Sequence, residues 1–129
     1  MAQISFIESK LLSLSFQTDL EGLKDGLSIK HNNGYSEDDN KSFIVRFNID
    51  VTSKSGISIS LEYAGLFESD TEIPEDFQNS SFPTVNAPAI VFPYLRSFLS
   101  TFTLNAGLDP ITLPTINFKS SGEKNNEDS

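Results

Sequence analysis

Residues 43–63 read FIVRFNIDVTSKSGISISLEY and carry the strongest structural signal in the chain. Apolar side chains occupy every second position on both sides of the central SKSG, a composition typical of a turn. Strict alternation predicts an antiparallel hairpin with one buried face and one polar face. The residues expected on the buried face are Phe43, Val45, Phe47, Ile49, Val51, Ile57, Ile59, Leu61 and Tyr63. That face needs a second layer to cover it.

The segment before the hairpin predicts two more strands. Between residues 4 and 16 the even positions are largely apolar, and two charged residues interrupt the pattern near Glu8. This favours one long strand with a bend or bulge near Glu8. A short second strand is expected around Ile29, followed by a polar loop over residues 31–41. The inward-facing residues of the long strand would be Ile4, Phe6, Leu12, Leu14 and Phe16.

One helix is expected after the hairpin. Residues 68–76 hold five carboxylates and no base, and prolines follow at 74, 83 and 88, so this connection should be a loop or broken helical turns. Apolar residues then recur at helical spacing until Gly107, which predicts a helix from about Pro88 or Pro93 to Asn105 that covers the sheet. The residues with this spacing are Val91, Leu95, Phe98, Leu99 and Phe102.

The opposite side of this helix is small and uncharged. It carries serines and threonines, and Arg96 is the one charged residue between Asn86 and Leu108. A helix face exposed to solvent normally carries more charge, so we expect a second copy of the chain to cover it. The protein should therefore be an oligomer. The helix residues assigned to this assembly are Val91, Leu95, Phe98 and Phe102.

The chain after Gly107 should be an extended strap followed by a tail. Residues 108–118 alternate apolar and polar between two prolines, which favours an extended, semi-rigid segment. Residues 119–129 are polar with mixed charge, and such a composition predicts disorder. With 129 residues in total, the chain has room for one domain, which we place at residues 1–118.

Composition excludes several kinds of partner and compartment. The formal net charge of −9 disfavours nucleic acids and anionic lipids and favours basic partners. Cysteine is absent, so nothing indicates an oxidising compartment. The first 16 residues lack the pattern of a signal peptide, and no apolar run approaches the roughly 20 residues that span a bilayer. We expect a cytoplasmic protein that does not insert into membranes.

The candidates for chemistry are weak. His31 is the one histidine and lies in a polar context, which is typical of a solvated surface residue. The carboxylates of residues 37–39 and 68–76 lack the residue order of a calcium-binding loop. Phosphate-binding loops and nucleophile elbows are missing from the sequence. We therefore expect neither catalysis nor a metal or other cofactor, and binding has to carry the function.

Several segments resemble a known family. The stretch VFPYLR at residues 91–96, through Gly107, and LPTINF at residues 113–118 are similar to the SecB export chaperones, as are LSF at 14–16 and GLF at 65–67. The resemblance implies an α+β fold with a four-stranded antiparallel sheet and one long helix. It also implies a dimer of dimers with the helices between the sheets, and an ATP-independent holdase that passes preproteins to the SecA motor.

The sequence departs from this family in two places. SecB proteins dock on SecA through carboxylates of the exposed sheet face, whereas the matching positions here are Ser13, Gln17 and Ser60. Glu62 is the one carboxylate kept nearby. The family also has a second helix after the strap, and the short polar segment from Lys119 onward predicts that this helix is missing.

Three binding functions remain open, ahead of an enzyme. They are a holdase for preproteins, a SecB-like chaperone dedicated to one client such as the antitoxin of a toxin–antitoxin pair, and an oligomeric adaptor without chaperone activity. For either chaperone we expect unfolded clients to bind beside the helix, under the strap. The residues assigned to this site are Leu66, Phe67, Ile111, Leu113, Ile116 and Phe118, and the alternative is that all six belong to the core.

Overall fold

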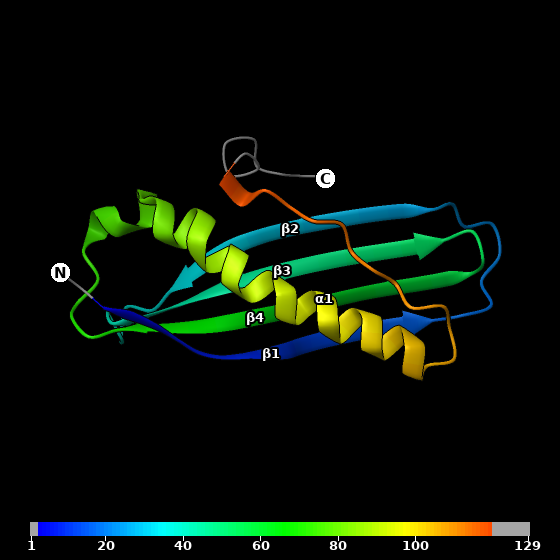
Figure 1. Cartoon of the computed structure of the whole chain (residues 1–129), viewed down its shortest axis with the longest axis horizontal. Coiled ribbons are helices and arrows are strands. Elements are labelled where there is room, and N and C mark those ends of the chain that lie inside the picture. Colours follow the sequence, from blue (N-terminus) through cyan, green and yellow to red (C-terminus); the bar gives the residue numbers. More distant parts are fainter. Residues whose placement is uncertain (1–2, 120–129) are drawn as a thin grey trace.

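A computed structural model, which describes residues 3–119, has four antiparallel strands and one long helix (Figure 1). The sheet order is β1-β4-β3-β2, so that β1 and β2 form its edges. The predicted α+β architecture is confirmed. The elements are β1 (Ile4–Gln17), β2 (Gly26–Tyr35), β3 (Ser42–Ser53), β4 (Ile57–Ser69), a 3-10 turn η1 (Glu75–Asn79), a π turn η2 (Phe82–Asn86) and α1 (Ala87–Asn105).

The central hairpin forms in the register that its alternation predicts. Phe47 is paired with Tyr63, and Ile49 with Leu61, so the odd-numbered residues of β3 and β4 share one face. The turn between them holds Gly56 at a φ of 102°, where a Cβ would lie 2.7 Å from the carbonyl oxygen of Leu20. Glycine is therefore required, because the turn packs against the β1–β2 connection at this point.

Strand β1 contains two bulges where the sequence predicted one. Register shifts lie between Phe6 and Glu8 and between Leu11 and Ser13. Each bulge inserts one residue and reverses the alternation that follows. The expectation that Leu12 faces inward is therefore wrong. Leu12 is one of the two inserted residues and is 41% exposed, while Leu11 packs against the core in its place.

Strand β2 is longer than predicted. The polar loop expected over residues 31–41 is wrong for its first half, because β2 continues through Tyr35 and pairs with β3 along its whole length. Strand pairing supplies hydrogen bonds to a segment whose own composition is typical of a loop. Asn33 has an added constraint, since its side-chain amide donates to the carbonyl oxygen of Pro83 at 2.9 Å.

The core lies between the sheet and α1. Val91, Leu95 and Leu99 are fully buried on the inner side of the helix. Gly65 of β4 permits this contact, because a Cβ there would lie only 2.4 Å from the Val91 side chain. The predicted helix is confirmed, and it begins at Ala87, with Pro88 in its first turn.

The segment after α1 crosses the sheet a second time. Figure 1 shows it running back from the end of α1 over β3 toward β2. Residues 109–117 have no regular secondary structure, in keeping with the predicted strap, which we define as residues 108–118. The predictions of a disordered tail and a missing second helix concern residues 119–129, of which Lys119 alone lies in the described part of the chain.

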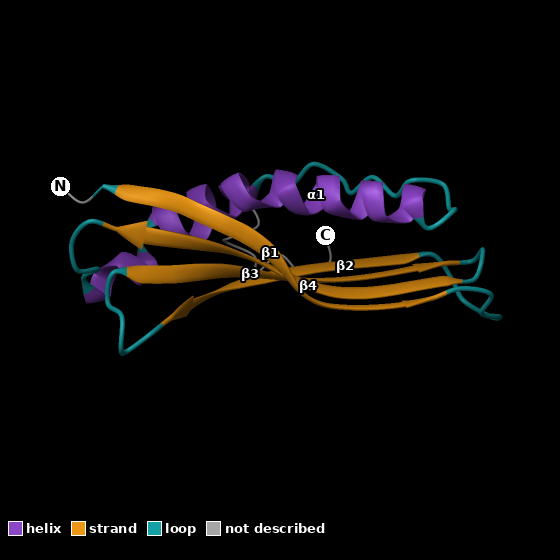
Figure 2. Ribbon diagram, turned by 90° about the horizontal axis from the view of Figure 1, so that it is seen from below, coloured by secondary structure: helices purple, strands orange, loops and turns teal. Residues whose placement is uncertain are grey.

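Helix and strap lie on the same side of the sheet. Figure 2 shows α1 along one face and no covering element on the opposite face among the described residues 3–119. We call these the covered face and the open face. The open face carries the even-numbered residues of β3 and β4, among them Asn48, Asp50, Ser60 and Glu62. The fold therefore offers the strap, the outer side of α1 and the open face as candidate binding surfaces.

Candidate functional site

Two hydrogen bonds fasten the strap to α1. The Arg96 Nε donates to the carbonyl oxygen of Leu113 at 3.1 Å. The backbone N–H of Ile111 donates to the Thr103 hydroxyl at 2.9 Å, and this hydroxyl donates in turn to the carbonyl oxygen of Leu99. Thr103 is fully buried, so its hydroxyl depends on these partners. The helix thereby fixes the path of the strap.

The far end of the strap is anchored by Phe118. Its ring lies 5.3 Å from His31, 5.6 Å from Phe92 and 5.9 Å from Phe47, measured between ring centroids. His31 is therefore a half-buried residue of the covered face, and the expectation of a solvated loop histidine is wrong. Burial lowers its pKa from the usual value of 6.5, which favours the neutral ring beside these phenyl groups.

The six residues assigned to the client site do not form one surface. Phe67, Leu113 and Phe118 are at most 4% exposed and belong to the core. Leu66 is on the open face, since its neighbour Phe67 faces the core and alternate residues of a strand point to opposite sides. Ile111 and Ile116 are half-buried on the strap. These two remain as accessible apolar side chains on the helix side.

The outer side of α1 presents a further apolar surface. Ile90, Tyr94 and Leu104 are 39%, 51% and 58% exposed. Together with Ser97 and Thr101 they recur at intervals of four and three residues, which places them on one stripe of the helix. Beside this stripe is a hollow of about 470 Å³, which is lined by Tyr94, Ser97, Phe98, Thr101, Phe102 and Asn105.

The four residues predicted for assembly all pack against the core of this chain, and only Phe98 and Phe102 are also partly accessible. Val91 and Leu95 are fully buried against the sheet, so another copy of the chain cannot contact them. Phe98 and Phe102 stack on each other at 5.9 Å and line the outer hollow. Sequence reasoning missed Ile90, Tyr94 and Leu104, although their four-and-three spacing was a signal that could have found them.

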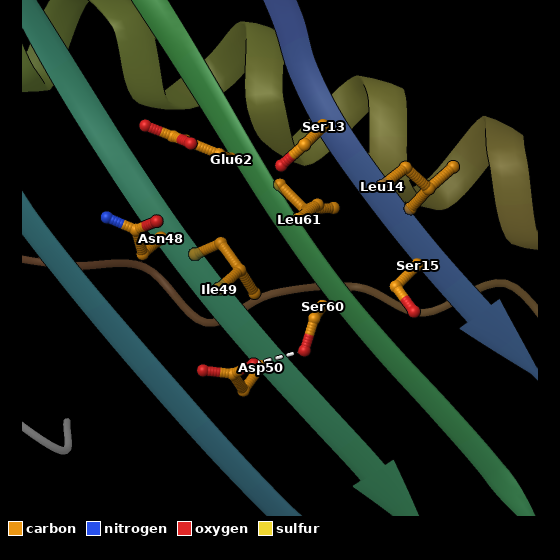
Figure 3. Close-up of a pocket in the computed structure, with 9 residues that line it drawn as sticks. All are labelled: Ser13, Leu14, Ser15, Asn48, Ile49, Asp50, Ser60, Leu61 and Glu62. Carbon is orange, nitrogen blue, oxygen red and sulfur yellow. Dashed lines mark hydrogen bonds between the residues drawn. The ribbon is translucent and has the colours of Figure 1, made fainter.

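The open face has a shallow hollow of about 230 Å³ near its centre (Figure 3). Polar side chains of β1, β3 and β4 lie around it, and the hydroxyl of Ser60 donates to the carboxylate of Asp50. Glu62, assigned to SecA docking, forms an ion pair with Arg46 at 3.0 Å. The polar residues that line the hollow are Ser13, Ser15, Asn48, Asp50, Ser60 and Glu62.

The charge of the open face is nearly balanced. The strand register places four carboxylates and three basic side chains on it, a net of −1 against −9 for the whole chain. A strongly acidic docking surface, as the family resemblance implies, is therefore not present on these strands. The charged residues are Glu8, Lys10, Lys30, Arg46, Asp50, Glu62 and Glu68.

The described residues 3–119 contain no group of three or more His, Cys, Asp or Glu side chains placed to hold a metal ion. Within the same range, α1 is not apolar enough to span a membrane.

These features define a small α+β protein whose exposed apolar surfaces suit contacts with other polypeptides. The family model described as preprotein translocase subunit SecB matches residues 14–127. The match covers most of the chain, including all of β2, β3, β4, α1 and the strap. The chain belongs to the SecB family.

Curated relatives match over shorter segments. A protein of Methanocaldococcus jannaschii is 40% identical over 65 residues, which are 50% of this chain and 41% of that protein. The protein-export protein SecB of Cereibacter sphaeroides is 30% identical over 80 residues, which are 58% of this chain and 47% of the relative. The matched part of the chain thus spans less than half the length of these relatives.

Solved structures share the fold. A SecB-like chaperone of Mycobacterium tuberculosis, in complex with a ChAD peptide from the HigA1 antitoxin, superposes with a TM-score of 0.69 and 16% identity, covering 88% of this chain and 87% of that chain. A protein of unknown function from Streptococcus agalactiae has a TM-score of 0.55 at 8% identity, covering 89% and 99%. At these identities the likeness concerns the fold.

Proposed function

We propose that this protein is an ATP-independent holdase of the cytoplasm, which binds non-native polypeptides and keeps preproteins competent for export by the Sec pathway. The observation that carries the proposal is the combination of accessible apolar side chains on the strap with the edge strand β2, which the strap approaches (Figure 1). Membership of the SecB family supports it.

The client site is proposed on the helix side, at the strap. Ile111 and Ile116 offer apolar contacts, and Phe118 brings the end of the strap against β2 through His31. An edge strand has unpaired backbone N–H and C=O groups along one side. An extended client segment could add to β2 through these groups while its alternate side chains contact the strap. The net charge of −9 favours basic clients.

Assembly is proposed through the outer side of α1. The exposed side chains of Ile90, Tyr94 and Leu104 and the adjoining hollow form an apolar surface that a second copy could cover. A tetramer built as a dimer of dimers would place these helices between two sheets. Tyr94→Glu combined with Leu104→Glu should yield a smaller, folded species by native mass spectrometry. A wild-type chain that is monomeric at micromolar concentration would remove this part of the proposal.

The client site is tested by replacing Ile111 and Ile116 together with serine. The double variant should keep its oligomer mass and far-UV spectrum and lose protection of an unfolded model protein against aggregation, because burial of apolar area is the main term in such binding. Thr112→Ala with Thr115→Ala is the matched control, since these exposed neighbours share the strap. Full protection by the serine variant would exclude the strap from the site.

A second candidate is a chaperone dedicated to one client, such as an antitoxin. The nearly balanced charge of the open face favours it, because delivery to SecA would depend on carboxylates there. The structural neighbour in complex with an antitoxin peptide is in keeping with this alternative. Protection of several unrelated unfolded proteins would favour the general holdase. Protection confined to one antitoxin would favour the dedicated chaperone, and no protection at all would favour an adaptor.

A further inference from the structure

The open face has one apolar region, at the end of the sheet away from the Ser60 hollow. Ile44 of β3 and Leu66 of β4 are register partners there, and Ala64 lies two residues from Leu66 on the same face. The next open-face positions along β3 and β4 are polar or charged, while the bulge residue Ile7 of β1, next to Glu8, the register partner of Leu66, is 47% exposed. Neither α1 nor the strap reaches this side of the sheet (Figure 2), so no described element covers these side chains.

Around this pair the surface forms a hollow of about 470 Å³. Gly34 of β2 leaves room in this hollow, because a Cβ at this position would lie 3.1 Å from Ile44 Cγ1. The absent side chain leaves Ile44 and Leu66 as an accessible apolar floor. The hollow is lined by Gly34, Tyr35, Ser36, Asp39, Ser42, Phe43, Ile44, Arg46, Leu66 and Glu68.

The rim of the hollow is acidic. Residues 36–41 and 68–76 lie side by side, because the N–H of Ser69 donates to the carbonyl oxygen of Lys41 at 2.7 Å and the N–H of Ile73 donates to that of Asn40 at 2.8 Å. These two segments together carry eight carboxylates and one lysine. The negative charge of the chain is therefore concentrated beside this end of the open face.

Two carboxylates of the rim line the hollow itself. The N–H of Lys41 and the hydroxyl of Ser42 donate to Asp39, and these bonds hold the pKa of its carboxyl below the usual value. Glu68, the register partner of Ser42 on β4, also lines the hollow. The guanidinium of Arg46, which also lines the hollow, is occupied by Glu62 at 3.0 Å. A ligand would thus meet an apolar floor beside negative groups.

We propose that this hollow is a second docking site, separate from the client site at the strap, for an extended polypeptide segment that carries a lysine or arginine next to large apolar side chains. Charge complementarity selects this occupant, since the rim attracts a cation and the floor accepts an aliphatic or aromatic group. A second copy of this chain is disfavoured because it would bring two acidic rims together. A nucleic acid is disfavoured because the carboxylates of the rim repel its phosphates.

The test uses the full-length chain with its isoleucine and leucine methyl groups labelled for NMR. The probe is a decapeptide in which lysine alternates with leucine, and its control is the same peptide with glutamate in place of lysine. The lysine peptide should shift the methyl signals of Ile44 and Leu66, and the glutamate peptide should not. The affinity of the lysine peptide should fall as the salt concentration is raised, because the charges of the rim are exposed and salt screens them.

Two variants separate the floor from the rim. Ile44→Thr with Leu66→Thr, which keeps strand-compatible residues, should weaken peptide binding about tenfold by removing apolar contact area. Asp39→Asn with Glu68→Gln should weaken it about threefold and flatten its salt dependence. Asp19→Asn with Glu21→Gln is the matched control, because it removes the same charge from exposed residues of the β1–β2 connection, outside both the hollow and the strap, and should leave affinity unchanged.

Several outcomes would overturn the proposal. They are shifts confined to the methyl groups of Ile111 and Ile116, equal affinity for the lysine and glutamate peptides, and wild-type affinity in the Asp39→Asn, Glu68→Gln variant. The last comparison remains valid if the threonine variant fails to fold, since the rim variant leaves the floor intact. Binding that survives in the Ile111→Ser, Ile116→Ser variant would support the second site even if the proposed holdase activity were disproved.

Discussion

The two faces of the sheet are built by the same strands, yet the chain treats them differently. On the covered face, Phe43, Val45, Phe47 and Ile49 are at most 1% exposed, while their neighbours Ile44, Arg46 and Asn48 on the open face are partly exposed. The helix and the strap cover the first face, and no element within residues 3–119 covers the second. Side chains one position apart can therefore serve stability on one face and recognition on the other.

The sharpest test of this contrast replaces adjacent residues of β3. Phe47→Ala should destabilise the protein by about 3–5 kcal/mol, because the ring is fully buried against Phe92 and Phe118 and its loss leaves a cavity. Asn48→Ala, one position along on the open face, should change stability by no more than about 0.5 kcal/mol. Urea denaturation measures both. Equal losses would mean that the open face is covered in solution.

A second comparison uses one glycine from each face. Gly65→Ala should cost about 1–3 kcal/mol, since its Cβ would meet the Val91 side chain at 2.4 Å in the packed layer below α1. In Gly34→Ala the added Cβ would lie 3.1 Å from the Ile44 side chain on the open face. That side chain can move, so the loss of stability should be smaller. Thermal unfolding of the two variants gives the order. A larger loss at Gly34 would contradict the assignment of the faces.

The smallest expected effect concerns pH. Burial lowers the pKa of His31, so the folded state keeps the ring neutral while the unfolded chain binds a proton below pH 6.5. The unfolded state then holds more protons, and stability present above pH 6.5 is lost as pH falls. Urea midpoints at pH 7.5 and 5.5 should differ more for the wild type than for His31→Gln. The same difference in both proteins would show that His31 is not desolvated.

The periodicity of the sequence predicted those elements that bury the same face along their whole length. The hairpin at residues 43–63 was foreseeable because every second residue faces one continuous core, and the apolar spacing of α1 reports its inner side in the same way. Strand β2 was foreseeable only around Ile29. Its second half, including Asn33 and Gly34, is a strand because β3 pairs with it, and that partner lies outside the segment and leaves no trace in its own composition.

The candidate sites were less predictable than the fold. Leu113 and Phe118 belong to a segment that alternates apolar and polar residues, a pattern that fits an accessible groove as well as a core. Packing of Phe118 against His31 and Phe92 places it inside. Leu66 shares its apolar character with Phe67, yet the two point to opposite faces because they are adjacent on a strand. Assigning a residue to a face requires the register, which is a property of paired strands.

The sequence by itself determined the two periodicities of the chain, the breaks at Gly56 and Gly107, and the excess of carboxylates, because these follow from residue type and spacing alone. Tertiary structure decided which apolar residues are accessible. The bulges of β1 turned Leu12 outward, and the pairing of β2, β3 and β4 placed Ile44 and Leu66 beside the acidic rim. The physical reason is that the burial of a side chain depends on which other segments pack against it. The sequence of one segment does not specify those partners, which are set by the whole fold.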